Sequence, residues 1–185
     1  MDVATDFTLR AYVEVRNRHE FGRRIYNWQV YIRPDGCGQG LQLVPPSQGL
    51  GPTVFWYDGE QSVIRAAGEH GVPAALLIQQ EIKHGVRDVQ LSCSNSSSPM
   101  GIGVVDGLPM VQYQEAKASR SARIMACQDG DDVKVGYRPK ATSPLPDVCA
   151  EIQLTAECVQ GQDHGLSDIA LCCGSTKNGQ CRHAR

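Results

Sequence analysis

The sequence predicts an all-β domain, stabilised by disulfides and folded as an antiparallel sandwich or prism with little helix. Three observations support this fold class: short stretches of alternating apolar and polar residues, frequent turn residues (19 Gly and 10 Pro among 185 residues) and eight cysteines. Frequent turns favour many short strands over long helices. A chain of this length can bury one substantial core, so we expect a single β-rich domain over residues 1–185.

The first elements are predicted from alternation and residue type. Residues 7–15 alternate strictly, which is typical of a half-buried strand. The apolar face of this strand would carry Phe7, Leu9, Ala11, Val13 and Val15. Residues 25–32 are aromatic and β-branched and predict a second strand.

Further strands are expected where apolar runs lie between turn residues. These runs are 54–57, 110–115, 122–127 and 133–137. Residues 36–52 are expected to be loop-rich, with one short apolar stretch at 41–44. Residues 62–67 fit either one helical turn or a strand. Residues 128–132 predict an exposed acidic turn, 139–146 an irregular connector, and 174–185 a polar tail attached by Cys181.

A stretch of ten residues occurs twice. His84–Cys93 returns as His164–Cys173 at an offset of 80 residues, with the pattern H-G-[VL]-x-D-[VI]-x-L-x-C. Such self-similarity indicates a repeated supersecondary unit. Local signals over 74–82 favour a helix between Pro73 and Gly85, but the second copy follows an alternating strand over 150–159. We therefore favour a strand over 75–82 and a hairpin duplicated at 73–100 and 149–176.

The G-x-x-[DN]-[VI]-x-L-x-C core of this repeat resembles the repeated strand of the vitelline membrane outer layer protein family, whose fold is a β-prism. The resemblance covers about ten residues in each copy. It implies a fold only, and neither a function nor a site is transferred from it.

The cysteines predict disulfides rather than free thiols or a metal site, because they form no C-x-x-C pair and no histidine pair has zinc spacing. The candidates are Cys37, Cys93, Cys127, Cys149, Cys158, Cys172, Cys173 and Cys181. In the duplicated hairpin Cys158 would face Cys173, which leaves Cys93 to pair with Cys127 or Cys37. Disulfides indicate an oxidising compartment.

The charge and hydropathy of the sequence limit which classes of partner and which cellular location we expect. The formal net charge is −2, without the basic footprint of a nucleic-acid-binding protein. No segment has the length of a membrane span, and the N-terminal residues lack the apolar core of a signal peptide. Together with the cysteines, this predicts a secreted protein or one exposed on a virion surface.

Candidate chemistry is sparse. The repeat pairs His84 with Asp88 and His164 with Asp168, which could serve acid–base or metal chemistry. We interpret these residues as turn-shaping, since Asp side chains often cap turns. Residues 101–107 have the wrong glycine spacing for a dinucleotide site. Neither a cofactor nor a metal is expected. An aromatic platform that could bind carbohydrate would consist of Tyr26, Trp28, Tyr31, Trp56 and Tyr57. We favour the alternative that at least part of this set packs in the core.

These features predict a non-enzymatic structural or interaction protein of an extracellular assembly or particle surface, with protein partners or self-assembly. One alternative is a virion component, such as a capsid, decoration or tail protein. The other is a small secreted hydrolase that uses His84, His164 or His70 in a cleft. Convergence of the two His–Asp pairs on one pocket would favour the hydrolase.

Overall fold

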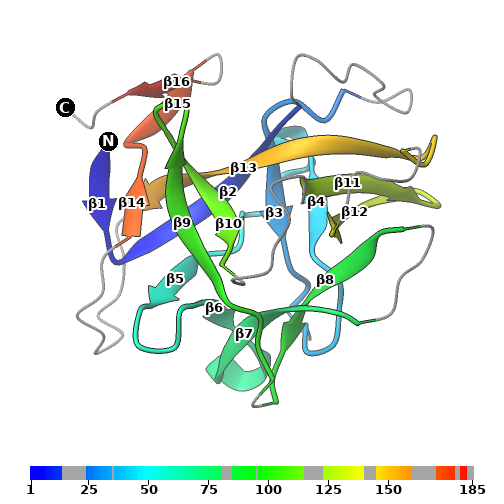
Figure 1. The fold of residues 1–185 in the computed structure, drawn as a ribbon, viewed down its shortest axis with the longest axis horizontal. Coiled ribbons are helices and arrows are strands. Elements are labelled where there is room, and N and C mark those ends of the chain that lie inside the picture. The colour runs from blue at the N-terminus through cyan, green and yellow to red at the C-terminus, as the bar shows by residue number, and fades with distance from the viewer. Residues whose placement is uncertain are drawn as a thin grey trace.

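The computed structural model describes residues 1–13, 24–34, 36–80, 85–94, 96–114, 123–139, 145–159, 170–177 and 180–182. Strands dominate these residues (Figure 1). In chain order the strands are β1 Asp2–Ala4, β2 Asp6–Val13, β3 Trp28–Tyr31, β4 Gln42–Val44, β5 Phe55–Asp58, β6 Val63–Ala67, β7 Pro73–Ile78, β8 Arg87–Ser92, β9 Met100–Val105, β10 Leu108–Tyr113, β11 Arg123–Asp129, β12 Asp132–Arg138, β13 Cys149–Val159, β14 Ala170–Cys172, β15 Ser175–Lys177 and β16 Gln180–Arg182. Two short 3₁₀ helices, η1 Pro46–Gln48 and η2 Glu69–Gly71, lie between strands.

The large antiparallel sheet closes on itself. It contains β2 to β13, and beyond the linear strand order β4 also pairs with β12 and β2 with β13. Hydrogen-bonded neighbours therefore form the closed ring β2-β3-β4-β12-β8-β7-β6-β5. Closure removes the exposed edges that an open sheet would leave. The prediction of an all-β, disulfide-stabilised fold is confirmed, but a barrel takes the place of the expected sandwich or prism.

The twelve strands of this sheet repeat in three groups of four. Strands β2, β5, β6, β9, β10 and β13 form an inner barrel, in which the β6–β9 junction is a backbone hydrogen bond of 2.9 Å from Met100 to Ser62. The hairpins β3–β4, β7–β8 and β11–β12 lie outside it and contact one another. This threefold arrangement is of the β-trefoil type.

The core fills this barrel. Its main cluster takes residues from all three groups, among them Phe7, Leu9, Phe55, Ile64, Leu91 and Leu154. Phe7 and Phe55 are directly opposite each other on β2 and β5, and their stacked rings have centroids 6.2 Å apart. Both rings are fully buried. The apolar face predicted for residues 7–15 is buried at Phe7, Leu9 and Ala11, but Thr8 and Tyr12 on the other face are buried too. The expectation of a half-buried strand is therefore wrong for β2, and residues 14–15 lie outside the described residues.

Most predicted strands form, with differences at their ends. Of the strand expected over 75–82, residues 75–78 lie in β7, residues 79–80 do not, and 81–82 lie outside the described residues. Residues 62–67 contain β6. Ile25 is not in β3, because the chain turns at Asn27, which has a positive φ of 64°. Among the described residues, β1, β4, β9 and the β15–β16 hairpin were not predicted as strands. β4 forms in a segment that was expected to be loop-rich, and the hairpin forms where a polar tail was expected.

The two copies of the ten-residue stretch occupy different settings. In the first copy, β7 and β8 form the expected antiparallel hairpin. In the second, β14 pairs with β1, while the contact with β13 is one parallel bridge between Glu157 and Cys173. The predicted hairpin of the second copy is therefore wrong in its pairing, and the turn that would join its strands lies outside the described residues.

Four disulfides use all eight cysteines. The bridges are Cys37–Cys93, Cys127–Cys149, Cys158–Cys172 and Cys173–Cys181. The expected Cys158–Cys173 pair is wrong. Adjacent residues of a strand point to opposite faces, so Cys172 points toward Cys158 and Cys173 turns to Cys181. The Cys37 alternative for Cys93 is confirmed.

Candidate ligand-binding groove

The predicted His–Asp sites are only partly described. Asp88 is half-buried on β8, whereas His84, His164 and Asp168 lie outside the described residues. The described residues therefore do not test whether the two pairs converge on one pocket. Among the described residues, no group of three or more His, Cys, Asp or Glu side chains is arranged to hold a metal ion.

Two other sequence interpretations are settled by the local structure. Residues 101–107 lie in β9 and the tight turn to β10, where Asp106 and Gly107 have positive φ, so no helix N-terminus is present for a dinucleotide phosphate. Residues 128–132 form the acidic turn between β11 and β12, as expected. Asp129 and Asp132 face each other across this turn and contact cationic or amide side chains.

The aromatic residues do not share one platform. Trp56 is 5% exposed and belongs to the core. Trp28 and Tyr57 pack against the core cluster. Tyr26 is exposed, but its ring lies edge-on to Tyr12 at 5.1 Å between centroids. Core packing is therefore the role of Trp56, and Trp28 and Tyr57 contribute to it from the edge of the core.

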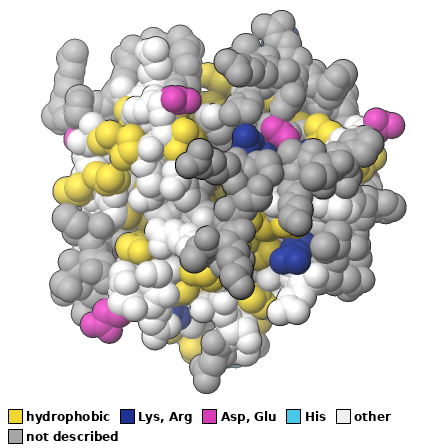
Figure 2. Space-filling view, in the orientation of Figure 1, with side chains coloured by type: hydrophobic (Ala, Val, Ile, Leu, Met, Phe, Trp, Pro, Cys, Tyr) yellow, Lys and Arg dark blue, Asp and Glu magenta, His cyan; other side chains and the backbone are white. Residues whose placement is uncertain are grey.

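On the face shown in Figure 2, hydrophobic side chains form several small, separate clusters among polar atoms and backbone. Scattered apolar side chains of this kind are normal for a protein surface. Depressions in the surface are therefore more informative about binding than exposed apolar area.

A groove of about 330 Å³ lies where β8 meets the β11–β12 hairpin and the start of β13. Strand register determines which side chains line it. Asp88 of β8 is opposite Gly136 of β12, and Lys134 of β12 is opposite Cys127 of β11. Because residues two apart on a strand share a face, Lys134 and Gly136 point to the groove side. Val133 on the other face belongs to the core.

The floor and one wall of this groove are apolar. Val86, Met125 and Cys149 form a small buried cluster separate from the main core. The Cys127–Cys149 disulfide joins β11 to β13 beside it. The wall continues along Pro146 and Val148, and the Val148 side chain is 49% exposed.

Gly136 lines the groove and packs closely against Val86. A Cβ at this position would lie 2.5 Å from Cγ1 of Val86, closer than side chains approach each other. We expect G136A to lower the free energy of unfolding by about 1–3 kcal/mol, because the extra methyl group must displace Val86 from a packed cluster. Urea denaturation measures the change.

Gly51 provides a matched control for this substitution. A Cβ at Gly51 meets nothing within 4 Å, so G51A should leave the urea midpoint nearly unchanged. Equal midpoints for G136A and the unchanged protein would show that Val86 does not limit space at the groove floor.

The rim of the groove is charged. Lys134 contacts Asp129, and this hydrogen bond raises the pKa of the lysine above its usual value. Partial burial acts in the opposite direction, while the charges of Asp129, Asp88 and Asp132 raise the pKa further. The lysine is therefore a firmly charged ammonium group that is already matched by Asp129.

Asp88 also acts on Lys134 through its charge, but its carboxylate has no matching hydrogen bond or ion pair of its own among the described residues. Within the described part of the chain, no side chain donates a hydrogen bond to its carboxylate or forms an ion pair with it. Asp88 and Asp129 against Lys134 leave one net negative charge in the lining. The groove therefore combines an apolar wall with an excess carboxylate, which suits a ligand with a positive charge.

The described residues that line a second depression, of about 570 Å³, are uncharged. Amide and hydroxyl side chains line most of it, and Gln79 donates a hydrogen bond to Gln90 across the β7–β8 hairpin. The lining residues are Leu77, Ile78, Gln79, Gln80, Gln90, Ser96 and Ser97. Such groups could meet the hydroxyl groups of a carbohydrate.

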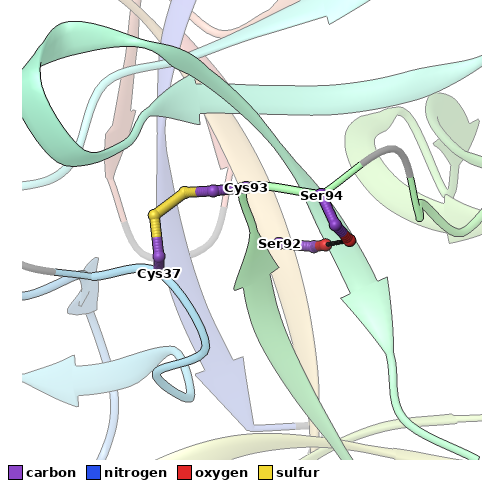
Figure 3. Close-up of a disulfide and its surroundings, with 4 residues drawn as sticks. All are labelled: Cys37, Ser92, Cys93 and Ser94. Atoms are coloured by element: carbon purple, nitrogen blue, oxygen red, sulfur yellow. Dashed lines mark hydrogen bonds between the residues drawn. A yellow bond between two sulfur atoms is a disulfide. The ribbon is translucent and has the colours of Figure 1, made fainter.

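Disulfides hold the segments around these depressions together. Figure 3 shows Cys37 on the segment before β4 joined to Cys93 just after β8, with the Ser92 and Ser94 hydroxyls 2.9 Å apart beside it. The backbone continues this connection, since Gly38 donates to Leu91 at 2.8 Å. Disulfides that limit motion in this way are typical of proteins in oxidising compartments.

The barrel is similar to part of a toxin. A solved structure named "CARDS toxin, full-length" matches with a TM-score of 0.51 and 13% sequence identity. The match covers 82% of this chain but 27% of the toxin chain, so this chain spans about a quarter of that protein's length. At this identity the likeness shows the fold alone. No family model and no curated protein matches the sequence.

Sequence reasoning missed most of the groove. Asp88 was singled out through its proposed histidine partner, and Asp129 through the acidic turn. Lys134 and Val148 carried no motif. Their proximity depends on the pairing of β8 with β12 and on the Cys127–Cys149 bridge, which no local pattern indicates.

Among the described residues, helices are confined to single short turns, and none could cross a membrane.

Proposed function

We propose that this chain is a non-enzymatic interaction protein that works outside the cytosol, in an extracellular assembly or on a particle surface. The observation that carries the proposal is the groove between β8, the β11–β12 hairpin and β13, which is built on strands and braced by a disulfide. Sites on rigid strands hold their geometry better than sites on loops. The four disulfides and the toxin-like neighbour support a location outside the cytosol.

Binding to intact cells tests the proposal. The oxidised protein, labelled with a fluorophore at its N-terminus, should bind saturably to some members of a panel of cell types, and excess unlabelled protein should compete. Flow cytometry at 4 °C measures this, with a labelled protein of similar size and net charge as the control. Binding that never saturates, or that matches the control on every cell type, would contradict a specific interaction.

Native mass spectrometry distinguishes self-assembly from the binding of another molecule. A ladder of oligomers would favour self-assembly, including a role in a particle such as a virion, while a stable monomer would favour a receptor-binding or ligand-binding role. The hydrolase alternative would need a histidine in a cleft. His70 is exposed in η2 and does not line either depression.

A further inference from the structure

We propose that the groove between β8, β11–β12 and β13 binds an arginine side chain presented by a partner protein. This inference rests on the proposed function and specifies which chemistry the partner offers. The groove is open at the surface, and its lining joins an apolar wall to an unmatched carboxylate. An occupant must therefore have an apolar stem and a cationic end.

The carboxylates favour a cation over an anion or a neutral group. Asp88 has no described hydrogen-bond or ion-pair partner, and Lys134 is already matched by Asp129. Further carboxylates lie at the edges: Asp131 and Asp132 in the hairpin turn, and Asp147 between the lining residues Pro146 and Val148. Arg33 matches Asp132 at 3.6 Å. A positive ligand would complete this pattern of charge, whereas a negative ligand would meet repulsion.

The apolar wall favours arginine over a bare cation. Val148, Pro146 and the Cys127–Cys149 disulfide offer contact area to a methylene stem, and long cationic side chains bury such stems while their heads stay at polar groups. A guanidinium group also carries several donors in one plane and can bind a carboxylate with two hydrogen bonds. Lysine has the stem but offers only a compact charge.

A pair of peptides tests the charge requirement directly. The probe is the blocked peptide acetyl-Gly-Ala-Arg-Ala-Gly-amide, and its control carries citrulline, which is similar in shape but neutral, in place of arginine. Titration into ¹⁵N-labelled protein should shift amide signals of β8, β12 and residues 145–149 with the arginine peptide. The citrulline peptide should bind at least about tenfold more weakly, which corresponds to the loss of one charge-assisted contact.

Variants assign the binding to the groove. D88N removes the unmatched carboxylate and should weaken the arginine peptide about tenfold. D106N makes the same change in the exposed β9–β10 turn and should leave the affinity unchanged. V148A should weaken both peptides equally. Circular dichroism checks that each variant is folded.

Each outcome has a distinct meaning. Equal affinity for the arginine and citrulline peptides, or equal effects of D88N and D106N, would overturn the proposed site. An absence of signal shifts with millimolar arginine peptide would also overturn it, even if D88N did not fold. If the labelled protein still binds cells saturably while the peptide fails, the interaction function stands and its contact lies elsewhere.

Discussion

We expect F7A to lower the free energy of unfolding by about 3–5 kcal/mol, the range for removing a fully buried aromatic ring. Phe7 is fully buried on β2, directly opposite Phe55 of β5. Since β2 pairs with β3, β5 and β13, a cavity there weakens the junction of the first and last groups of strands. Domains are stable by only about 5–15 kcal/mol in total, so this loss is large.

Chemical denaturation with guanidinium, followed by fluorescence of the two tryptophans, measures the effect. V104A removes methyl groups from a valine that is 48% exposed and serves as the control, with an expected change within about 0.5 kcal/mol. A change for F7A as small as that for V104A would mean that the Phe7–Phe55 stack is not part of the cooperative core.

Local patterns predict a strand where apolar residues gather on one of its faces. The alternation over residues 7–15 indicated β2, and its apolar face is the one that enters the core. The ends of strands were harder, because a single backbone angle can end them: Asn27 has a positive φ before β3. β9 was missed because its two glycines break the apolar run, although its strand pairs along its whole length with β10.

The repeat that stands out in the sequence is not the repeat of the fold. The three outer hairpins share only a short apolar-x-apolar pattern, seen in Leu41–Leu43, Val89–Leu91 and Val133–Val135. Backbone hydrogen bonds join these segments, from Leu41 to Val89 at 2.9 Å and from Val135 to Leu41 at 2.8 Å. Three residues are too few to be distinguished from chance alternation, whereas ten matching residues at 84–93 and 164–173 are conspicuous.

The closure of the barrel and the position of the groove could not be predicted from the sequence for the same physical reason. Both depend on contacts between strands that are far apart in the chain, such as β2 with β13 and β8 with β12. A hydrophobic pattern shows which face of a strand is buried, but many partners could satisfy that face. The disulfide partners are undetermined for the same reason, since eight cysteines allow 105 pairings.

Removal of the Cys37–Cys93 bridge is the second change with a large expected effect. This bridge has the largest sequence separation of the four, 56 residues, and it joins the first group of strands to the second. The chain-entropy model predicts a loss of about 4 kcal/mol for a closed loop of this size. We expect C37S/C93S to unfold at a clearly lower guanidinium concentration than the unchanged protein.

The bridge Cys173–Cys181 provides the comparison, because it closes only 8 residues. The same model predicts a loss of about 2.5 kcal/mol for C173S/C181S. If stabilisation comes from restricting the unfolded chain, the Cys37–Cys93 variant must be the less stable of the two. The reverse order would show that local packing around each bridge, rather than loop length, sets its contribution.

Accessibility predicts that this same bridge is reduced first. Cys93 is exposed, while each of the other three disulfides contains a cysteine that is at most 4% exposed: Cys149, Cys172 or Cys173. A thiolate must reach a sulfur atom to break a disulfide. Brief treatment with a dilute thiol, followed by alkylation and peptide mass mapping, should therefore label Cys37 and Cys93 before the other six cysteines.

The backbone hydrogen bonds of Gly38 and Leu41 to β8 should keep the segment around Cys37 in place after reduction. The barrel would then loosen at this junction without losing its strand order. Simultaneous labelling of all eight cysteines would instead mean that reduction requires global unfolding, and that the junction is as closed in solution as the core.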